Sequence, residues 1–187
     1  MRGRRQGTLV NDVGPRDHVQ GPADAPVTLL EYGDYQCPYC GAAHPIVKAL
    51  QRQLGDNLCF AFRHFPLTTI HEYAEGAAEA AEAASAQGKF WQMHDTLFEN
   101  QPALDFDSLV GYAEELGLDM ERFTTELENQ VYAPRVREDF ISGIRSGVNG
   151  TPTFFINGLR HEASFDFETM LEAIQARMQG LAAQRKQ

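Results

Sequence analysis

The sequence predicts an α/β protein in which a block of helices interrupts a sheet-containing domain. Two apolar runs, 27–32 and 58–65, flank a stretch whose apolar residues recur at helical spacing. Residues 70–147 show helical periodicity and no strand signal, and strand signals return at 153–156. The expected order is therefore βαβ, an all-helical insertion, and then ββα.

The first half of the predicted sheet domain is a strand–helix–strand unit. The run 27–32 is almost wholly apolar, which is typical of a strand buried on both faces. Apolar spacing predicts a helix over about 38–54, with Pro38 in its first turn, where the missing N–H is no loss, and a kink at Pro45. The run 58–65 is the second strand, so this half calls for parallel strands joined by a right-handed crossover.

The second half follows the helical block, whose last helix is expected at 131–144. A short apolar run, an Asn-Gly pair that is a strong hairpin signal, and an amphipathic stretch come after it. The expected elements are a strand, a tight turn, a returning strand and a closing helix, at 153–156, 157–158, 159–162 and 167–179.

Composition and charge exclude several classes of function. The 187 residues are 43% hydrophobic and 22% charged, as in ordinary globular proteins, and no run of 18 apolar residues predicts a membrane span. A formal charge of −10 does not attract phosphate backbones, so neither nucleic acid nor a membrane is an expected partner. The acidity lies in the helical block, because residues 71–130 carry 14 acids and 2 bases. Solvated outer helix faces are preferred to a dedicated partner surface as its explanation.

The elements predict a domain organisation with one insertion. The basic start of the chain is followed by Asn11, Asp12 and Gly14 instead of the apolar stretch of a secretory signal. The expected location is therefore cytoplasmic, or periplasmic or otherwise extracytoplasmic if the start is misassigned. The predicted parts are a flexible N-terminal arm at 1–20, a sheet domain at 21–68 and 148–180, an inserted helical domain at 69–147, and a C-terminal tail at 181–187.

Cys37 and Cys40 form a CxxC motif at the junction between the first strand and the first helix. The first turn of a helix leaves backbone N–H groups unpaired and carries a partial positive charge, which stabilises a thiolate. A free thiol has a pKa of about 8.5, and lowering it to about 6.5 makes the thiolate dominant at neutral pH. Cys37, at the exposed start of the helix, is the expected nucleophile. Cys40, one turn further in, is expected to resolve the mixed disulfide.

A bare CxxC is also half of a zinc site, and zinc needs two more ligands. His44, His64 and His71 follow in the sequence, but no second CxxC and no HxxxH pair is present. Redox chemistry is therefore preferred to zinc binding. The third cysteine, Cys59, lies inside the second predicted strand, and a buried, inert thiol is the best interpretation of it.

Two further positions are candidate site residues. Glu31 is an acid in an otherwise apolar strand, six residues before Cys37. One interpretation is a buried carboxylate with a raised pKa that moves protons to and from Cys40; the other is a glutamate that reaches solvent at a strand edge. Pro152 stands at the start of the third strand, where a residue without an N–H donor is tolerated.

The span from about 17 to 179 resembles the DsbA family of thiol-disulfide oxidoreductases, which have a thioredoxin-like fold with an inserted helical domain. The segments that carry the resemblance are Glu31-Tyr32-Gly33-Asp34-Tyr35-Gln36-Cys37-Pro38-Tyr39-Cys40, Arg63-His64-Phe65-Pro66-Leu67, Phe90-Trp91-Gln92-Met93-His94 and Gly147-Val148-Asn149-Gly150-Thr151-Pro152-Thr153-Phe154-Phe155-Ile156-Asn157-Gly158. Together these segments cover both halves of the sheet domain and part of the insertion.

The resemblance implies roles for particular residues. The family's nucleophile, resolving cysteine, cis-proline and buried acid carry over to Cys37, Cys40, Pro152 and Glu31. A cis bond before the proline would leave the backbone N–H and C=O of Thr151 available to an extended substrate. Pro38 and Tyr39, between the two cysteines, are also expected to contact substrate. No cofactor is expected.

The expected function is exchange of the CxxC dithiol with protein or small-molecule disulfides. The expected partners are disulfide-containing proteins or thiol substrates, together with a thiol or redox-protein electron partner. Tyr39 stands where the periplasmic oxidase has His, which favours a potential near that of glutaredoxins, at about −200 to −230 mV, and a reductase or isomerase direction. Two alternatives remain open: a non-catalytic thioredoxin-fold binding module, and a glutathione-dependent isomerase or transferase acting through one residue at position 37.

Overall fold

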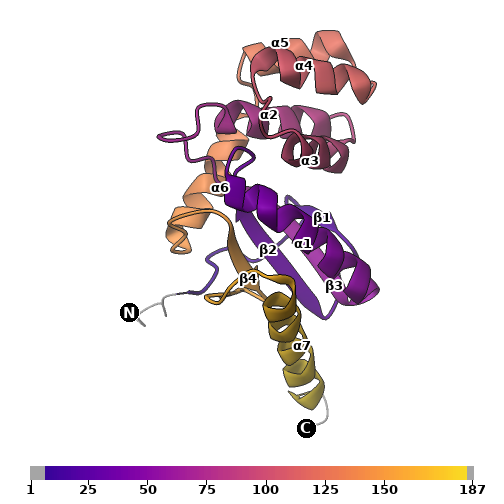
Figure 1. Cartoon of the computed structure of the whole chain (residues 1–187), viewed down its shortest axis with the longest axis vertical. Helices are drawn as coiled ribbons and strands as arrows, with labels where there is room; N and C mark the ends of the chain where they lie inside the picture. Colours follow the sequence, from indigo (N-terminus) through magenta and orange to yellow (C-terminus); the bar gives the residue numbers. More distant parts are fainter. Residues whose placement is uncertain (1–6, 185–187) are drawn as a thin grey trace. The chain divides into compact units, whose positions relative to one another are not determined.

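A computed structural model describes residues 7–184 of the chain (Figure 1). The described residues divide into two compact units. The sheet unit consists of the chain up to Tyr32, residues 42–63 and the chain from Ser142 onward. The helical unit consists of residues 33–41 and 64–141. The segment with Cys37 and Cys40 thus belongs to the helical unit and not to the unit that holds the sheet.

The sheet unit contains one five-stranded sheet with the order β1-β3-β2-β4-β5. Strand β2 pairs antiparallel with β4, so that Glu31 lies opposite Phe154, and β4 pairs antiparallel with β5, with Ile156 opposite Leu159. The four expected strands, their order along the chain and the Asn-Gly hairpin are confirmed, but the returning strand ends at Arg160 instead of residue 162, and β1 was not expected. The strands are β1 His18–Gln20, β2 Val27–Gly33, β3 Leu58–His64, β4 Thr153–Ile156 and β5 Leu159–Arg160.

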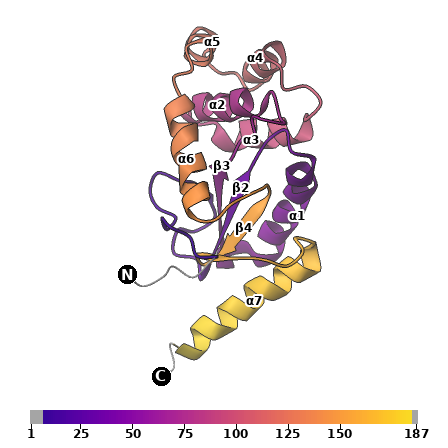
Figure 2. The ribbon, with the colours of Figure 1, turned by 90° about the vertical axis from the view of Figure 1, so that its left-hand side faces the viewer.

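Two helices complete this unit. Helix α1 (Pro38–Leu54) follows β2 and lies on one face of the sheet (Figures 1 and 2). A short turn, η1 (Gly55–Asn57), leads from α1 into β3. Helix α7 (Phe167–Gln184) packs against β4 and buries Met170 and Ile174 completely. Helix α7 extends beyond Gln179, so the tail expected from residue 181 is wrong for 181–184; residues 185–187 lie outside the described part.

The expectation of a flexible N-terminal arm is wrong for residues 7–20. Strand β1 lies within this segment and pairs antiparallel with β3. The Arg63 guanidinium donates to both carboxylate oxygens of Asp17, at 2.7 and 2.9 Å, and to the backbone carbonyls of Asn11 and Asp12. A buried cation needs such partners, and the segment is ordered because it supplies them. Residues 1–6 of the expected arm lie outside the described residues.

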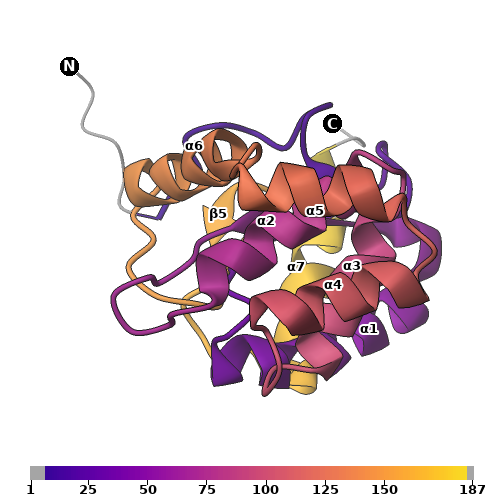
Figure 3. The ribbon, with the colours of Figure 1, turned by 90° about the horizontal axis from the view of Figure 1, so that it is seen from above.

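The helical unit is built from two layers of helices, with α4 and α5 over α2 and α3 (Figures 1 and 3). Asp105 and Asp119 accept the backbone N–H of Ser108 and Arg122 and so cap the first turns of α4 and α5. Within residues 7–184 no helix combines the length and the apolar character that a membrane span requires. The helices are α2 Ala74–Ser85, α3 Phe90–Glu99, α4 Phe106–Glu115, α5 Met120–Glu128 and α6 Ala133–Arg145.

Candidate active site

The CxxC segment begins helix α1. Cys37 directly precedes the helix, and its carbonyl accepts the first helical hydrogen bond, from the N–H of Gly41 at 3.1 Å. The N–H of Cys37 donates to the carbonyl of Asp34 at 3.1 Å, which closes a tight turn between β2 and α1. No acidic residue stands in the first turn of this helix, so the positive end of its dipole is not neutralised locally.

The two cysteines of the CxxC segment are buried, and the two residues between them are exposed. Pro38 is exposed and Tyr39 is 66% exposed, whereas Cys37 is 3% and Cys40 0% exposed. The expectation that Cys37 stands exposed at the helix start is therefore wrong. The turn folds back on residues of the helical unit, and the backbone of Cys37 is held there by the Gln101 side chain. Tyr39 has the exposure that contact with a substrate requires.

A backbone donor reaches one of the two sulfurs. The N–H of Asp34 points at Sγ of Cys40 at 3.5 Å. Hydrogen bonds to a thiolate favour the charged form, so this contact stabilises an ionised Cys40.

Asp34 holds the turn through three hydrogen bonds to its buried carboxylate. Oδ1 accepts the N–H of Gln36 at 2.8 Å, and Oδ2 accepts the N–H of Leu67 and a hydrogen bond from Nδ1 of His71, both at 2.8 Å. The side chain of Asp34 is 0% exposed and that of His71 15% exposed. This network fixes the backbone N–H that points at Cys40.

Gln101 fixes the other side of the turn. Its Nε2 donates to the carbonyls of Tyr35 and Cys37, each at 2.8 Å. Gly41 allows this approach, because a Cβ at that position would collide with Oε1 of Gln101. The Tyr35 hydroxyl is hydrogen-bonded to Nδ1 of His94 at 3.0 Å, and its ring packs on Phe98. The turn is thus held by side chains from the helical unit.

The remaining site candidates lie in the sheet unit. Glu31, in the middle strand of the sheet, is 2% exposed, which contradicts the alternative of a glutamate that reaches solvent at a strand edge. The peptide bond between Thr151 and Pro152 is cis, the isomer that the resemblance implies. The roles assigned to Glu31, Thr151 and Pro152 stay predictions.

The third cysteine is buried, and two histidines of the zinc alternative pair with carboxylates. Cys59 is 3% exposed within β3, and burial raises the pKa of its thiol, as expected for a thiol without a catalytic role. His64 forms a buried pair with Glu82, at 2.9 Å between Nε2 and Oε1. His71 is bonded to Asp34. His64 and His71 thus each have a carboxylate partner, and zinc binding stays an untested alternative.

Sequence analysis missed the residues that position the turn. Asp34 lies inside a segment that carries the family resemblance, but nothing local to it indicates three donors. His71 attracted attention only as a possible metal ligand. Gln101 gave no signal at all, because it reaches the carbonyl of Tyr35 from 66 positions away in the chain. A polar residue whose partners are distant in sequence leaves no local pattern.

The comparisons with known proteins cover most of the chain. A family model described as thioredoxin matches residues 14–176. A curated relative from Salinispora arenicola, named "Na(+)/H(+) antiporter NhaA 1", is 49% identical over 165 residues, which cover 88% of this chain and 25% of that protein. This chain therefore spans about a quarter of the length of that relative.

Solved structures are similar over the same region. BdbD from Bacillus subtilis in its oxidised form has a TM-score of 0.78 and 26% identity, with 86% of this chain and 92% of that chain covered. DsbA2 from Pseudomonas aeruginosa has a TM-score of 0.69 and 25% identity, with 88% and 96% covered. The chain belongs to the thioredoxin family and is a DsbA-like member of it, with a thioredoxin-like fold.

Proposed function

We propose that the chain catalyses thiol–disulfide exchange through Cys37 and Cys40. The observation that carries the proposal is the placement of both sulfurs at the N-terminus of α1, with a backbone N–H pointing at Sγ of Cys40. The similarity to DsbA-like proteins supports the same class of chemistry. Ion transport, which the name of the curated relative indicates for that protein, is not part of the proposal, because the match covers a quarter of its length.

The proposed reaction has two exchange steps. The Cys37 thiolate attacks one sulfur of a substrate disulfide; a mixed disulfide forms, and the other substrate sulfur leaves as a thiolate and takes up a proton. The Cys40 thiolate then attacks Sγ of Cys37, forms the Cys37–Cys40 disulfide and releases the second substrate thiol. The substrate gains two electrons and two protons, and the dithiol loses the same number. A thiol or redox-protein partner reduces the disulfide and closes the cycle.

Other residues have supporting roles in the proposal. Glu31, buried in β2, would carry protons for Cys40. Thr151 and Pro152 would present backbone groups to an extended substrate, and the exposed Tyr39 would contact the same substrate. The Tyr39 hydroxyl carries no positive charge to stabilise a Cys37 thiolate, so we propose a potential of about −200 to −230 mV. Such a couple is largely reduced against a cytosolic poise of about −280 mV and would act as a reductase or isomerase.

Two measurements test the proposal. The first is the rate of disulfide reduction in insulin by the reduced protein, with Cys59→Ser as the matched control for loss of a thiol. The second is equilibration in glutathione buffers followed by alkylation, which gives the potential of the Cys37–Cys40 pair. Absence of turnover together with two freely titrating thiols would favour a binding module. A potential above about −150 mV would reverse the proposed direction.

A variant of the second cysteine, Cys40, distinguishes thiol–disulfide exchange from the alternative of a glutathione-dependent isomerase or transferase. If the chain acted through position 37 alone, Cys40→Ser would keep its activity with glutathione. We expect instead that Cys40→Ser accumulates mixed disulfides and turns over slowly, which gel shift under non-reducing conditions detects.

A further inference from the structure

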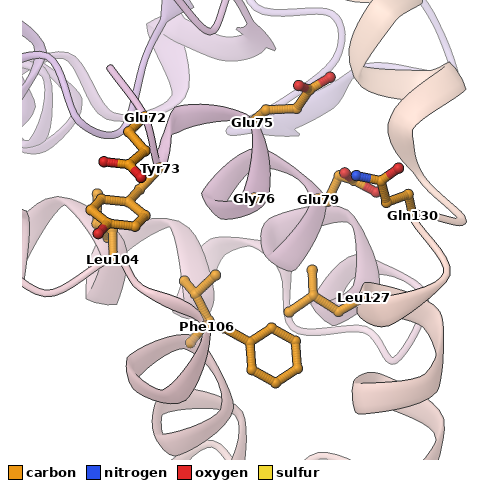
Figure 4. Close-up of a pocket in the computed structure, with 10 residues that line it drawn as sticks. Glu72, Tyr73, Glu75, Gly76, Glu79, Leu104, Phe106, Leu127 and Gln130 are labelled. Atoms are coloured by element: carbon orange, nitrogen blue, oxygen red, sulfur yellow. The ribbon is translucent and has the colours of Figure 1, made fainter. Parts of the chain in front are cut away.

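A cavity within the helical unit is lined on one side by acidic residues. Its volume is about 330 Å³, which is at the small end of the range for ligand sites, about 300–1,000 Å³. The acidic wall comes from α2 and the turn before it, and the opposite wall comes from the loop before α4 and from α4 and α5 (Figure 4). Its lining residues are Glu72, Tyr73, Glu75, Gly76, Glu79, Leu104, Phe106, Leu109, Leu127 and Gln130.

Glu79 is the most unusual residue of this cavity. It is 3% exposed, and the backbone N–H groups of Tyr132 and Ala133 lie near enough to its carboxylate to lower its pKa. Its Oε2 atom is buried and accepts no hydrogen bond from the part of the chain that the structure describes. A buried carboxylate oxygen without a donor costs free energy, and in a native protein it calls for an explanation. A ligand that donates to Oε2 would supply one.

The charges around Glu79 indicate that such a ligand carries a positive charge. Glu72 and Glu75 also line the cavity, and none of the lining residues is a lysine, arginine or histidine. Burial and the nearby charge of Glu75 raise the pKa of Glu79 to about 7, despite the two backbone donors. A cation bound beside Glu79 would relieve both causes at once, because it would neutralise the charge and donate to the free oxygen.

The walls define the shape of the ligand. Leu104, Leu109 and Leu127 are the leucines of the lining. Figure 4 shows Leu127 and the Phe106 ring on the side away from Glu75, with the Tyr73 ring next to Leu104. The three carboxylates do not form a metal-ligating set, since they do not offer three oxygens that all lie within 4.8 Å of one another. Acids on one side and hydrocarbon on the other suit an ammonium or guanidinium group on an aliphatic stem.

We propose that this cavity binds an alkylguanidinium or alkylammonium group, with the cation at Glu79 and its stem against the leucines. The group is either a free amine or a basic side chain of a partner polypeptide, and the cavity has room for one such group. The site is independent of the thiol chemistry proposed for Cys37 and Cys40. It gives part of the acidic helical block a specific role in binding.

The test is a titration followed by amide NMR shifts in the full chain. The probes are agmatine and the blocked peptide acetyl-Gly-Arg-Gly-amide, with 1-pentanol and the citrulline form of the peptide as neutral counterparts. We expect both cationic probes to shift the amides of Gly76 and Gln130 and the neutral ones to shift neither. Tighter binding of agmatine indicates a free amine, and tighter binding of the peptide indicates a polypeptide partner.

Variants assign the effect to the cavity. Glu79→Gln removes the charge with almost no change of shape and should weaken binding about tenfold to a hundredfold. Glu114→Gln, on the exposed surface of α4, removes the same charge outside the cavity and should leave binding unchanged. Leu127→Ala, checked for folding by its melting temperature, should weaken binding through the stem. No shift with either cation, or equal weakening by the Glu79 and Glu114 variants, overturns the proposal.

Discussion

The turn at residues 33–41 and the Glu79 cavity belong to the same unit but treat a buried carboxylate in opposite ways. Asp34 is 1% exposed and accepts two backbone N–H groups and a hydrogen bond from His71. Glu79 is 3% exposed and leaves Oε2 without a donor among the described residues. A carboxylate whose oxygens all accept hydrogen bonds fixes the backbone around it. A carboxylate with an unsatisfied oxygen is unfavourable until a ligand donates to it, so its hydrogen bonding favours ligand binding. We therefore expect Asp34 to fix the geometry of the turn and Glu79 to bind a ligand.

The largest expected effect is on the rate of disulfide exchange, which should depend on the turn at residues 33–41 and not on the cavity at Glu79. Cys37→Ser should lower the rate of insulin reduction by about a thousandfold or more, because a hydroxyl at neutral pH is a far weaker nucleophile than a thiolate. Glu79→Gln should leave that rate within about twofold. Loss of exchange activity in the Glu79 variant, with its melting temperature unchanged, would show that the cavity is not independent of the thiol chemistry.

The next effect is on stability and its dependence on pH. The pKa of Glu79 is about 7 in the folded protein and near 4.5 otherwise, so the folded state holds this proton more tightly than the unfolded chain does. Stability from this group is complete below about pH 4.5 and is lost as the pH rises to about 7. Glu79→Gln should therefore raise the free energy of unfolding at pH 8 by about 2–3 kcal/mol and flatten its slope between these values.

Urea unfolding at pH 5 and pH 8 measures this effect, with Glu114→Gln as the control for net charge. A destabilising Glu79→Gln at pH 8 would mean that its carboxylate is satisfied after all.

Asp34→Asn should act in the opposite direction. In the variant, the Nδ2 donor takes the place of Oδ2, which accepts the N–H of Leu67 and the hydrogen bond from His71. Both hydrogen bonds are then lost, so we expect the free energy of unfolding to fall by about 1–3 kcal/mol. The displaced turn should also change the reduction potential of the Cys37–Cys40 pair, which a merely structural residue would leave alone. An unchanged potential in a folded Asp34→Asn protein would limit Asp34 to a structural role.

Gln101→Ala tests the second support of the turn. Two hydrogen bonds to the carbonyls of Tyr35 and Cys37 are lost, and both carbonyls become accessible to water, so the expected cost is about 1–2 kcal/mol. Faster alkylation of Cys37 at pH 6 should accompany this loss, because the cover over the turn is removed. Gln101→Glu, which keeps the size but not the donor, is the matched comparison.

The smallest expected effect concerns Cys59. This thiol is buried in β3 and its pKa is raised, so Cys59→Ser should leave the exchange rate within about twofold. In the reduced wild-type protein, iodoacetamide at pH 6 should label Cys37 before Cys59. The two thiols are equally buried, so the reverse order of labelling would show that the N-terminus of α1 does not make Cys37 the more reactive one.

Local sequence patterns determined the βαβ and ββα halves, the helical insertion and the CxxC segment at the start of a helix. Apolar spacing specifies helices and strands over a few residues, and a proline, a glycine or an Asn-Gly pair marks where they end. Cys37 and Cys40 could therefore be placed at the start of a helix from the chain alone, whereas the cis bond before Pro152 was expected only from the family resemblance. The hairpin after Ile156 follows from the same local rules, and it places Ile156 opposite Leu159.

Only the tertiary structure decided which buried groups have partners. Asp34 stands in the turn before the CxxC segment and Glu79 in an Ala- and Glu-rich helix, but neither context shows how many donors each carboxylate receives. Residues 7–20 show no periodicity, yet they pair with β3 and supply the carboxylate and carbonyls that bind Arg63. Hydrogen-bond partners and desolvation depend on which distant segments the fold brings together, and neither is written in the spacing of neighbouring residues.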